Sequence, residues 1–333
     1  MLVFENVSLK PYNTFGVDVS ADRLLELRTG GEVDSFLASG FDAGSCLILG
    51  SGANILFTGD FHGTVARIAT KGIMEISRQD GRVLLEVAAG EVWDDFVRHC
   101  VAQGYYGVEN LALIPAQVGG AVVQNIGAYG CEVKDVVSSV RAVCLKSGGE
   151  RSFSREECGF GYRTSLFKRR RGEYLVRSVR FSLSLEPHFH TEYGDVAERL
   201  RQRGGTTISS VYEVVSEIRR EKLPDVKVLG SAGSFFRNPV VPAGKWQELH
   251  AAFPQLKGFP EGDGVKLSAA QLIDSLGWKG YRRGDAGVHV RQALVLVNYG
   301  RATGGEILQL ACDIRDSVEQ RYGIRLEEEV III

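Results

Sequence analysis

The sequence predicts an α+β protein built from several subdomains. Its 333 residues suggest about two domains or a few smaller ones. With 44% hydrophobic and 24% charged residues, its composition is that of a globular protein. Strand-like and helix-like periods are mixed without the strict alternation of a doubly wound sheet, which is therefore the second choice of fold.

The amino-terminal part reads as strands around a helix, followed by a hairpin. Residues 1–66 contain short strands and one helix near Glu32–Ala38, and the apolar strand Cys46–Leu49 runs directly into a glycine turn. A hairpin is expected over residues 72–88, because it contains an Asp-Gly pair suited to a tight turn. An amphipathic helix over residues 92–104 follows, and its last residue is a terminating glycine.

The middle of the chain changes from strands to a helix. Residues 140–145 and 174–185 read as strands. Ser210 and Glu213 have the spacing of a capping box, so we expect a helix to open there and to stop before Pro224. A domain boundary is predicted near that point.

The carboxyl-terminal part again mixes helices and strands. Ser268 and Gln271 have the spacing of a helix cap, and residues 293–298 form a compact apolar strand. A long amphipathic helix ends at Gly323. Residues 324–333 are predicted to form a final strand.

Composition and charge narrow the class of partner. Forty residues are glycine, nearly twice the usual share of about 7%, which suggests close backbone approaches to a ligand. The net charge of −2 provides no positive field for a nucleic acid. No apolar run has the length of a membrane span, and Met1–Lys10 is too polar for a signal peptide. We therefore expect a cytoplasmic protein with a small-molecule substrate and no membrane partner.

The six cysteines contain no Cys-x-x-Cys pair. This pattern argues against a zinc ribbon and for reduced thiols that pack in the core. No metal site is predicted.

The first glycine-rich stretch, Leu49–Phe57, follows a strand and offers consecutive backbone N–H groups for an anion. Gly50 and Gly52 match the start of a dinucleotide fingerprint. Ile55, however, stands in place of the third glycine, and an apolar strand follows instead of a helix. A phosphate site and a plain tight turn both remain open.

The second stretch, Ile114–Gly130, combines glycines with the side-chain amides of Gln124 and Asn125. Ordering such a loop costs backbone entropy, which a bound partner would offset. The amides can donate and accept hydrogen bonds, as the edge of a flavin or nucleotide requires. The alternative is a buried loop whose amides bond to its own backbone.

Three further segments carry candidate reactive groups, and the first of them continues into a basic run. Arg163 lies among aromatic residues that would desolvate a guanidinium aimed at a carboxylate, although it could also simply stack on Tyr162. Lys168–Arg171 is expected to be a solvated loop. Ser234 lies on a glycine turn and could pass a proton, although a turn hydroxyl is the commoner role. Side chains along a strand point alternately to its two faces, so Glu327 and Glu329 are expected on one face and Glu328 on the other.

Seven motifs occur in the order found in the UDP-N-acetylenolpyruvoylglucosamine reductase family, which this chain resembles over nearly its whole length. Tyr193-Gly194-Asp195 resembles the longer, type I branch of that family. The chain departs from the family pattern at Ala53, Ala116, Thr164 and Glu328. The seven motifs are Asn13–Gly16, Leu49–Phe57, Ile114–Gly130, Gly161–Lys168, Lys222–Pro224, Gly233–Pro239 and Leu326–Val330.

The resemblance implies an FAD-binding fold of the PCMH/VAO type with two subdomains, plus a third α+β domain that binds substrate. It implies subdomains at residues 1–66 and 67–218 and a substrate domain at 219–325, with residues 326–333 returning to the active site. FAD would be bound non-covalently and NADPH would be the co-substrate. The implied activity is that of UDP-N-acetylmuramate dehydrogenase, an oxidoreductase of peptidoglycan synthesis and thus of cell shape and division. A monomer is expected.

In the implied reaction, flavin N5 delivers hydride to C3 of the enolpyruvyl group and Ser234 gives a proton to C2. Arg163 and Glu329 would polarise the substrate carboxylate. Tyr193, Lys222, Asn238 and Gln292 match substrate-binding positions. The matching cofactor positions are Gly50, Ser51, Gly52, Ala53, Asn54, Ile114, Pro115, Gly119, Gly120, Gln124, Asn125, Gly127, Ala128 and Tyr129.

Two other functions stay open. One is a PCMH-type flavin oxidase of another substrate, although the glycine loops contain no clear histidine for a covalent flavin link. The other is a nucleotide-sugar-binding protein without catalysis, which the presence of Arg163, Ser234 and Glu329 together disfavours. A plain nicotinamide dehydrogenase is disfavoured by Ile55 in the fingerprint.

Overall fold

The structure is a computed structural model that describes residues 1–333, except for the side chain of Ala43. The chain forms two compact units, each of which mixes helices with sheet, as predicted. Unit 1 comprises Met1–Val7, Ala21–Ser51 and His62–Arg219, and unit 2 comprises Ser8–Ser20, Gly52–Phe61 and Arg220–Ile333. The predicted three-part division at residues 66 and 218 stays a prediction.

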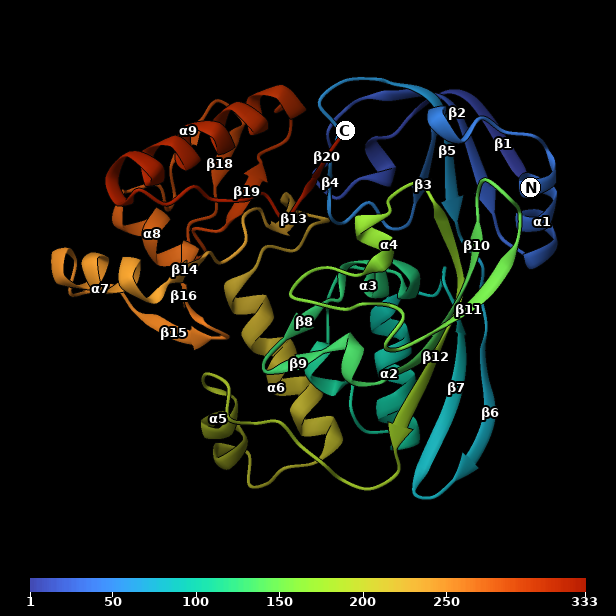
Figure 1. The fold of residues 1–333 in the computed structure, drawn as a ribbon, viewed down its shortest axis with the longest axis horizontal. Coiled ribbons are helices and arrows are strands. Elements are labelled where there is room, and N and C mark those ends of the chain that lie inside the picture. The colour runs from blue at the N-terminus through green and yellow to red at the C-terminus, as the bar shows by residue number, and fades with distance from the viewer. The chain divides into compact units, whose positions relative to one another are not determined.

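Unit 1 contains a four-stranded sheet of order β1-β2-β5-β3 and a five-stranded sheet of order β11-β10-β12-β7-β6 (Figure 1). The five-stranded sheet is antiparallel throughout, whereas β3 and β5 pair in parallel. The strands are β1 (Leu2–Ser8), β2 (Ser20–Leu27), β3 (Cys46–Leu49), β5 (Phe61–Ile68), β6 (Ile73–Gln79), β7 (Arg82–Ala88), β8 (Gly127–Ala128), β9 (Cys131–Glu132), β10 (Val137–Cys144), β11 (Glu150–Ser154) and β12 (Tyr174–Ser184).

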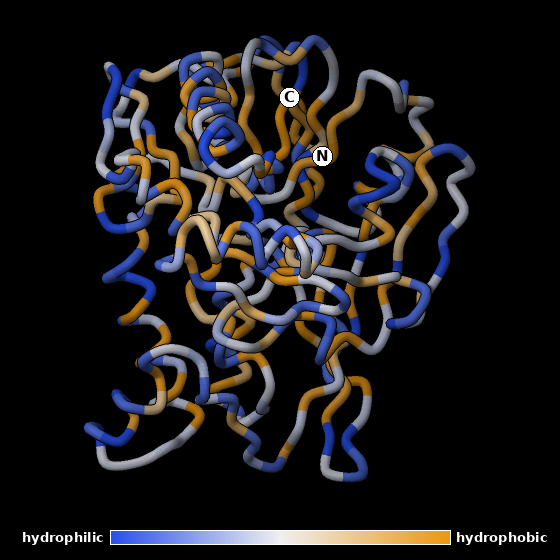
Figure 2. Tube along the Cα trace, turned by 60° about the vertical axis from the view of Figure 1, so that its left-hand side comes forward, coloured by the Kyte–Doolittle hydropathy of each residue, from blue (hydrophilic) through white to orange (hydrophobic). Residues whose placement is uncertain are grey.

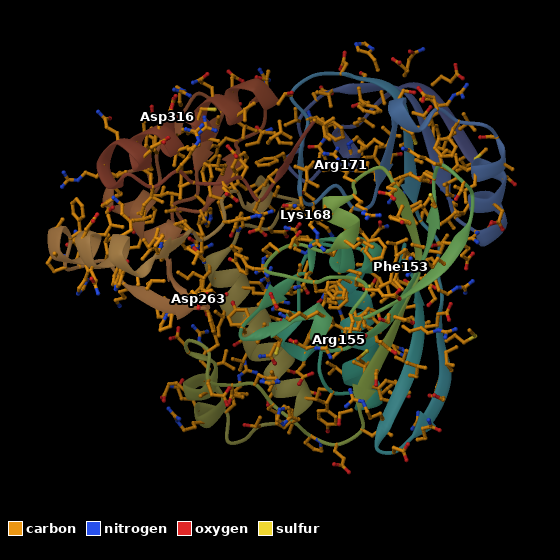
Figure 3. All side chains as sticks on the ribbon, in the orientation of Figure 1. Phe153, Arg155, Lys168, Arg171, Asp263 and Asp316 are labelled. Atoms are coloured by element: carbon orange, nitrogen blue, oxygen red, sulfur yellow. The ribbon has the colours of Figure 1, made fainter. Side chains whose placement is uncertain are left out.

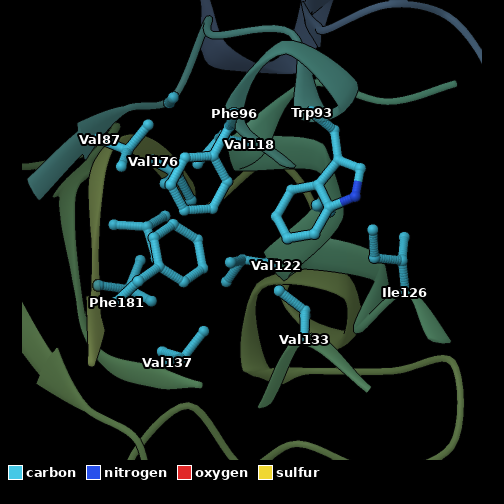
Figure 4. Close-up of a cluster of buried hydrophobic side chains, with 14 of the residues drawn as sticks. Val87, Trp93, Phe96, Val118, Val122, Ile126, Val133, Val137, Val176 and Phe181 are labelled. Carbon is cyan, nitrogen blue, oxygen red and sulfur yellow. The ribbon is translucent and has the colours of Figure 1, made fainter. Parts of the chain in front are cut away.

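Two helices of unit 1 cover the five-stranded sheet and build its core. Figure 4 shows Trp93 and Phe96 of α2 facing Phe181 of β12, with ring centroids 6.0 and 4.7 Å from that ring. Val118 and Val122 of α3 complete this buried cluster, so the start of α3 is fixed to the sheet. The helices are α1 (Gly30–Ala38), α2 (Trp93–Gln103), α3 (Val118–Gln124), α4 (Leu166–Arg169), α5 (Val196–Gln202) and α6 (Ile208–Lys222), which continues into unit 2 from Arg220.

Unit 2 has a sheet of order β13-β19-β18-β17, a smaller sheet of order β14-β16-β15, and a parallel pair of β20 with β4. Helix α9 packs on β18 and β19. The elements are β4 (Ile55–Leu56), β13 (Gly230–Ser234), β14 (Val240–Pro242), α7 (Ala243–Ala252), β15 (Gly258–Glu261), β16 (Gly264–Leu267), α8 (Ala269–Ser275), β17 (Arg282–Arg283), β18 (Ala286–Val288), β19 (Val295–Asn298), α9 (Gly304–Tyr322) and β20 (Ile331–Ile332).

Several local predictions are confirmed because the chemistry that fixes them is local. Asp80 and Gly81, with φ of 51° and 69°, form the turn of the β6–β7 hairpin. Gly104 and Gly323 end α2 and α9 in the left-handed conformation. Ser268 caps α8 through its hydroxyl, as expected.

Two predictions of element ends are wrong. The helix predicted to open at Ser210 begins at Ile208, because Thr207 accepts the hydrogen bond of the Ser210 N–H and acts as the cap. Residues 324–333 form a strand only at Ile331–Ile332. The preceding residues exchange single hydrogen bonds with 235–237 before the chain turns to β4, so no continuous ladder forms.

The described cysteines are free thiols, in agreement with the sequence expectation. Burial raises the pKa of Cys46 to about 11 and the pKa of Cys158 to about 12, as expected for thiols that pack.

Among the described helices, none is both long and apolar enough to cross a bilayer. Figure 2 shows why, since hydrophobic and hydrophilic stretches alternate along the whole chain.

Candidate active site

The second glycine-rich stretch is fixed to the core of unit 1 through its backbone. The N–H groups of Val118 and Gly119 donate to the carbonyls of Glu91 and Ala89, both at 2.9 Å. A Cβ on Gly119 would lie 2.9 Å from the Cβ of Ala89, so only glycine allows this approach. The first turn of α3 is therefore held in one place.

The two glycine-rich stretches meet at Gly50 and Gln117, both in unit 1. A Cβ on Gly50 would lie 3.0 Å from Gln117 Oε1. The Gln117 side chain is buried and its Nε2 donates to the Gly90 carbonyl at 3.3 Å, but its Oε1 has no hydrogen-bond partner among the described atoms. An enclosed, unsatisfied acceptor beside bare backbone suits a ligand that brings an N–H or O–H group.

The other residues of the first stretch are divided between the units. Gly50 and Ser51 belong to unit 1, whereas Gly52, Ala53 and Asn54 belong to unit 2. Gly52 has φ of 64°, and a Cβ there would lie 2.0 Å from the Tyr12 carbonyl oxygen. This position therefore requires glycine for conformational and steric reasons.

The two amides that end α3 hold the segment around Arg163. Asn125 is fully buried in the left-handed conformation. Its Nδ2 donates to the Gly161 carbonyl at 2.9 Å, and its Oδ1 accepts from the Lys134 N–H at 3.1 Å. Both polar groups of Asn125 thus bond within the protein, so its cofactor role stays a prediction.

Lys168 is not part of a solvated loop, contrary to the prediction for residues 168–171. Its ammonium donates to Gln124 Oε1 and, at 3.2 Å, to the Arg163 carbonyl. Residues 166–169 form the short helix α4, and the exposed Arg171 lies in the turn after it (Figure 3). The sequence missed this role because the partners of Lys168 belong to other segments.

The Arg163 guanidinium is held in a fixed position. Its Nη2 donates to the Gly127 carbonyl at 2.6 Å, and its Nη1 lies 4.0 Å from Glu132 Oε1. The guanidinium also covers the Tyr162 ring, 5.2 Å from the ring centroid, as the simpler interpretation predicted. With its side chain only 20% exposed, Arg163 is an oriented cation that suits a carboxylate.

Arg219 on α6 was not predicted from the sequence. Burial lowers the pKa of the Arg219 guanidinium, and the positive charge of Arg163 lowers it further. Tyr129 and Asp94 act in the opposite direction and raise this pKa, but less than burial lowers it. The Arg219 Nε has no hydrogen-bond partner among the described atoms. A charged residue at a helix end normally faces solvent, so no local signal marked it.

Tyr193 lies against the end of the glycine-rich loop in unit 1. Its ring packs edge-on against the Tyr129 ring, with centroids 6.0 Å apart at an angle of 87°. Burial raises the pKa of the Tyr129 hydroxyl. Tyr193 itself is 62% exposed, so it can contact a ligand that lies on this loop.

The backbone of unit 2 brings Ser234 and Glu329 onto neighbouring segments. Ser234 ends β13 after a bulge that includes Gly233, with φ of 72°. The N–H of Glu329 donates to the carbonyl of Phe235, the residue after Ser234, at 2.8 Å. Asn54 Nδ2 donates to the Glu329 carbonyl at 3.1 Å, so this predicted cofactor residue also fixes the glutamate backbone.

The other two glutamates of the terminal segment face arginines of unit 2. Glu328 accepts from Arg315 at 2.9 Å, and the exposed Glu327 lies 3.7 Å from Arg237. The backbone of Glu329 is held by Phe235 and Asn54.

The predicted substrate residues outside unit 1 have different settings. Gln292 Oε1 accepts from the Leu294 N–H at 3.3 Å, and the Leu294 carbonyl accepts from Phe235, which places Gln292 near the Ser234 strand. Asn238 Oδ1 accepts from Ala269 at the start of α8, at 3.0 Å. Lys222 is exposed at the end of α6.

Comparison with known proteins decides the family. Residues 224–333 match the family described as UDP-N-acetylenolpyruvoylglucosamine reductase, C-terminal domain. The reductase of Pseudomonas putida is 46% identical over 98% of this chain and 97% of its own length. That of Chromobacterium violaceum is 48% identical over 98% of both chains. This chain belongs to the UDP-N-acetylenolpyruvoylglucosamine reductase family.

The fold agrees with this membership. A solved reductase of the family from Thermus caldophilus has a TM-score of 0.70 and 28% identity, covering 100% of this chain and 99% of its own. Residues 41–153 match the family described as FAD binding domain. This member of the reductase family is thus an oxidoreductase with the predicted FAD-binding fold and a further α+β domain.

The residues present fit FAD. Gln117 offers a buried acceptor without a partner, and FAD carries N–H and O–H donors on its ring and its ribityl chain. Gly50 and Gly119 leave the backbone bare where a side chain would collide with the protein. In the second glycine-rich stretch, Gly120 and Pro115 are exposed, while Ile114 and Ala128 are half-buried.

Proposed function

We propose that this protein reduces the enolpyruvyl group of UDP-N-acetylglucosamine-enolpyruvate with NADPH and forms UDP-N-acetylmuramate for peptidoglycan. The observation that carries the proposal is the held Arg163 guanidinium, which is partly buried and aligned by the Gly127 carbonyl. A vinyl ether accepts hydride only when the charge that develops on its carboxylate is stabilised, and a preorganised guanidinium provides this stabilisation. The names of the family members support the same reaction.

Gly50, Gln117 and Gly119 would hold FAD, which when bound would supply the hydride, taken from NADPH, that adds to C3 of the enolpyruvyl group. Arg163 binds the substrate carboxylate and stabilises the negative charge that grows there. Glu329, on the segment that follows Leu326, polarises the same substrate carboxylate together with Arg163. The Ser234 hydroxyl gives its proton to C2, so that one hydride and one proton are added across the double bond.

Binding of the substrate is assigned to four further side chains. Tyr193 approaches the Tyr129 loop in unit 1, while Lys222 contributes a positive charge. Gln292 is near the Ser234 strand. Since Asn238 Oδ1 already accepts from Ala269, its Nδ2 is the group that remains for substrate. We further propose that the enzyme acts in the cytoplasm as a monomer.

The direct test is steady-state turnover with purified FAD-loaded protein. We expect NADPH oxidation only when the enolpyruvyl nucleotide sugar is added, with one product formed per NADPH consumed. Peroxide formation from an alcohol would instead indicate the oxidase alternative. Tight binding of the nucleotide sugar without NADPH oxidation would indicate a binding protein.

A further inference from the structure

One buried amide joins the two loops that carry Tyr129 and Tyr193. Asn110 is 1% exposed, and its Nδ2 donates to the Tyr129 carbonyl at 3.0 Å and to the His190 carbonyl at 2.7 Å. The two bonds use both of its N–H groups. Rotating the amide by half a turn would place its oxygen against two carbonyls, so this orientation is fixed.

Asn110 stands on a rigid support. It lies in the 3-10 turn Glu109–Leu111, whose last carbonyl accepts from the indole N–H of Trp93 at 2.9 Å. Trp93 and Leu111 are both fully buried. The Glu109 carboxylate accepts from the Gly107 N–H at 2.7 Å. The amide is thus tied to the core of unit 1 and acts as a fixed point for the two loops.

The loop that Asn110 holds at His190 carries Tyr193 three residues later. Phe189 anchors the same loop, with its ring 5.6 Å from the Tyr106 ring. Residues 192–195 are exposed, and Gly194 has φ of 60°. The position of Tyr193 therefore depends on the anchored His190 and on its contact with Tyr129.

We propose that Asn110 is a positioning residue that sets the separation of Tyr129 and Tyr193 and thereby the affinity for the nucleotide sugar. The proposal rests on the proposed function, in which Tyr193 binds that substrate. Asn110 touches neither substrate nor cofactor in this account. Its amide acts only through the two carbonyls, which hold both tyrosines at one distance.

The structural test is amide hydrogen exchange on the full-length Asn110→Leu protein, because leucine has a similar volume and no donor. We expect exchange to rise about tenfold in peptides covering residues 127–132 and 186–195. Asn298→Leu is the matched control, because Asn298 is also buried and its Nδ2 donates to the carbonyls of Phe15 and Ala302. In the control, faster exchange is expected only around its own partners. Asn110→Ser serves if the leucine variant does not fold.

The functional test separates positioning from general destabilisation. Asn110→Leu is expected to raise KM for the enolpyruvyl substrate about tenfold while the rate of flavin bleaching by NADPH stays within twofold. Tyr193→Ala should raise KM by itself. Adding Asn110→Leu to it should raise KM little further, because both substitutions remove the same contribution of Tyr193 to substrate binding.

Unchanged exchange in both loops, or fully additive effects of the two substitutions on KM, would overturn the role of Asn110. A wild-type protein that does not turn over the enolpyruvyl substrate would refute the proposed function instead. The exchange experiment would still decide whether Asn110 holds the two loops.

Discussion

Gly127→Ala perturbs the position of Arg163 by one methyl group. The added Cβ would lie 2.8 Å from Arg163 Nη1 and 2.9 Å from the Cys131 carbonyl oxygen, whereas ordinary contacts are 3.4–4 Å. The backbone carbonyl cannot yield cheaply, but the flexible guanidinium can. We therefore expect Arg163 to move away and to lose its 2.6 Å bond to the Gly127 carbonyl.

The size of the effect follows from that lost bond. A hydrogen bond from a charged group contributes about 1.5–3 kcal/mol, which corresponds to a decrease of about 10- to 150-fold in kcat/KM. Overpacking costs a further 1–3 kcal/mol or so of stability, expected as a decrease of several degrees in Tm.

The assay is stopped-flow absorbance of the two half-reactions at matched FAD content. Bleaching by NADPH should change little, whereas reoxidation by the enolpyruvyl substrate should slow by the factor above, because only that step uses Arg163. The control is Gly305→Ala, where a Cβ meets no atom within 4 Å and catalysis should be unchanged. If Gly127→Ala reoxidises at the wild-type rate, the assigned role of Arg163 is wrong, whereas equal slowing of both half-reactions would indicate the cofactor role predicted for Gly127.

Three further predictions concern other parts of the molecule. Ser234→Ala should leave bleaching by NADPH nearly intact but slow reoxidation by orders of magnitude, and equal slowing of both steps would refute the proton-donor role. Gln117→Leu should weaken FAD binding about tenfold, as measured by flavin fluorescence during dilution, because it removes a buried acceptor; unchanged affinity would contradict that contact. Burial raises the pKa of Glu26, but hydrogen bonds and charge from Arg28 and Arg67 outweigh burial, so the pKa is lowered overall. The ionised Glu26 carboxylate therefore stabilises the fold above about pH 4.3, and this stabilisation disappears as the pH falls through the lowered pKa. Glu26→Gln should accordingly lower Tm at pH 7 with a difference that shrinks in acid, and a pH-independent difference would exclude this origin.

The sequence was informative where the deciding chemistry is local. Gly104 and Gly323 end helices because the left-handed conformation favours glycine, and the Asp80-Gly81 pair makes its turn without help from the rest of the chain. The fold class follows from the mixture of strand and helix periods. The motif order identified the family, which the comparison with curated relatives confirms.

The sequence was uninformative where a residue acts through distant partners. The two carbonyls that Asn110 joins lie 19 and 80 residues away in the chain. Arg219 resembles any charged residue at a helix end until burial and the Arg163 charge are known. The partners of the Asn125 amide, Gly161 and Lys134, likewise belong to other segments of the chain.

The most direct test of the central claim is the visible spectrum of the purified protein during anaerobic titration, first with NADPH and then with the enolpyruvyl nucleotide sugar. We expect a yellow protein whose flavin absorbance bleaches with NADPH and returns on addition of the sugar. A protein that stays colourless after reconstitution with FAD, or a bleached protein that the sugar fails to reoxidise, would contradict it.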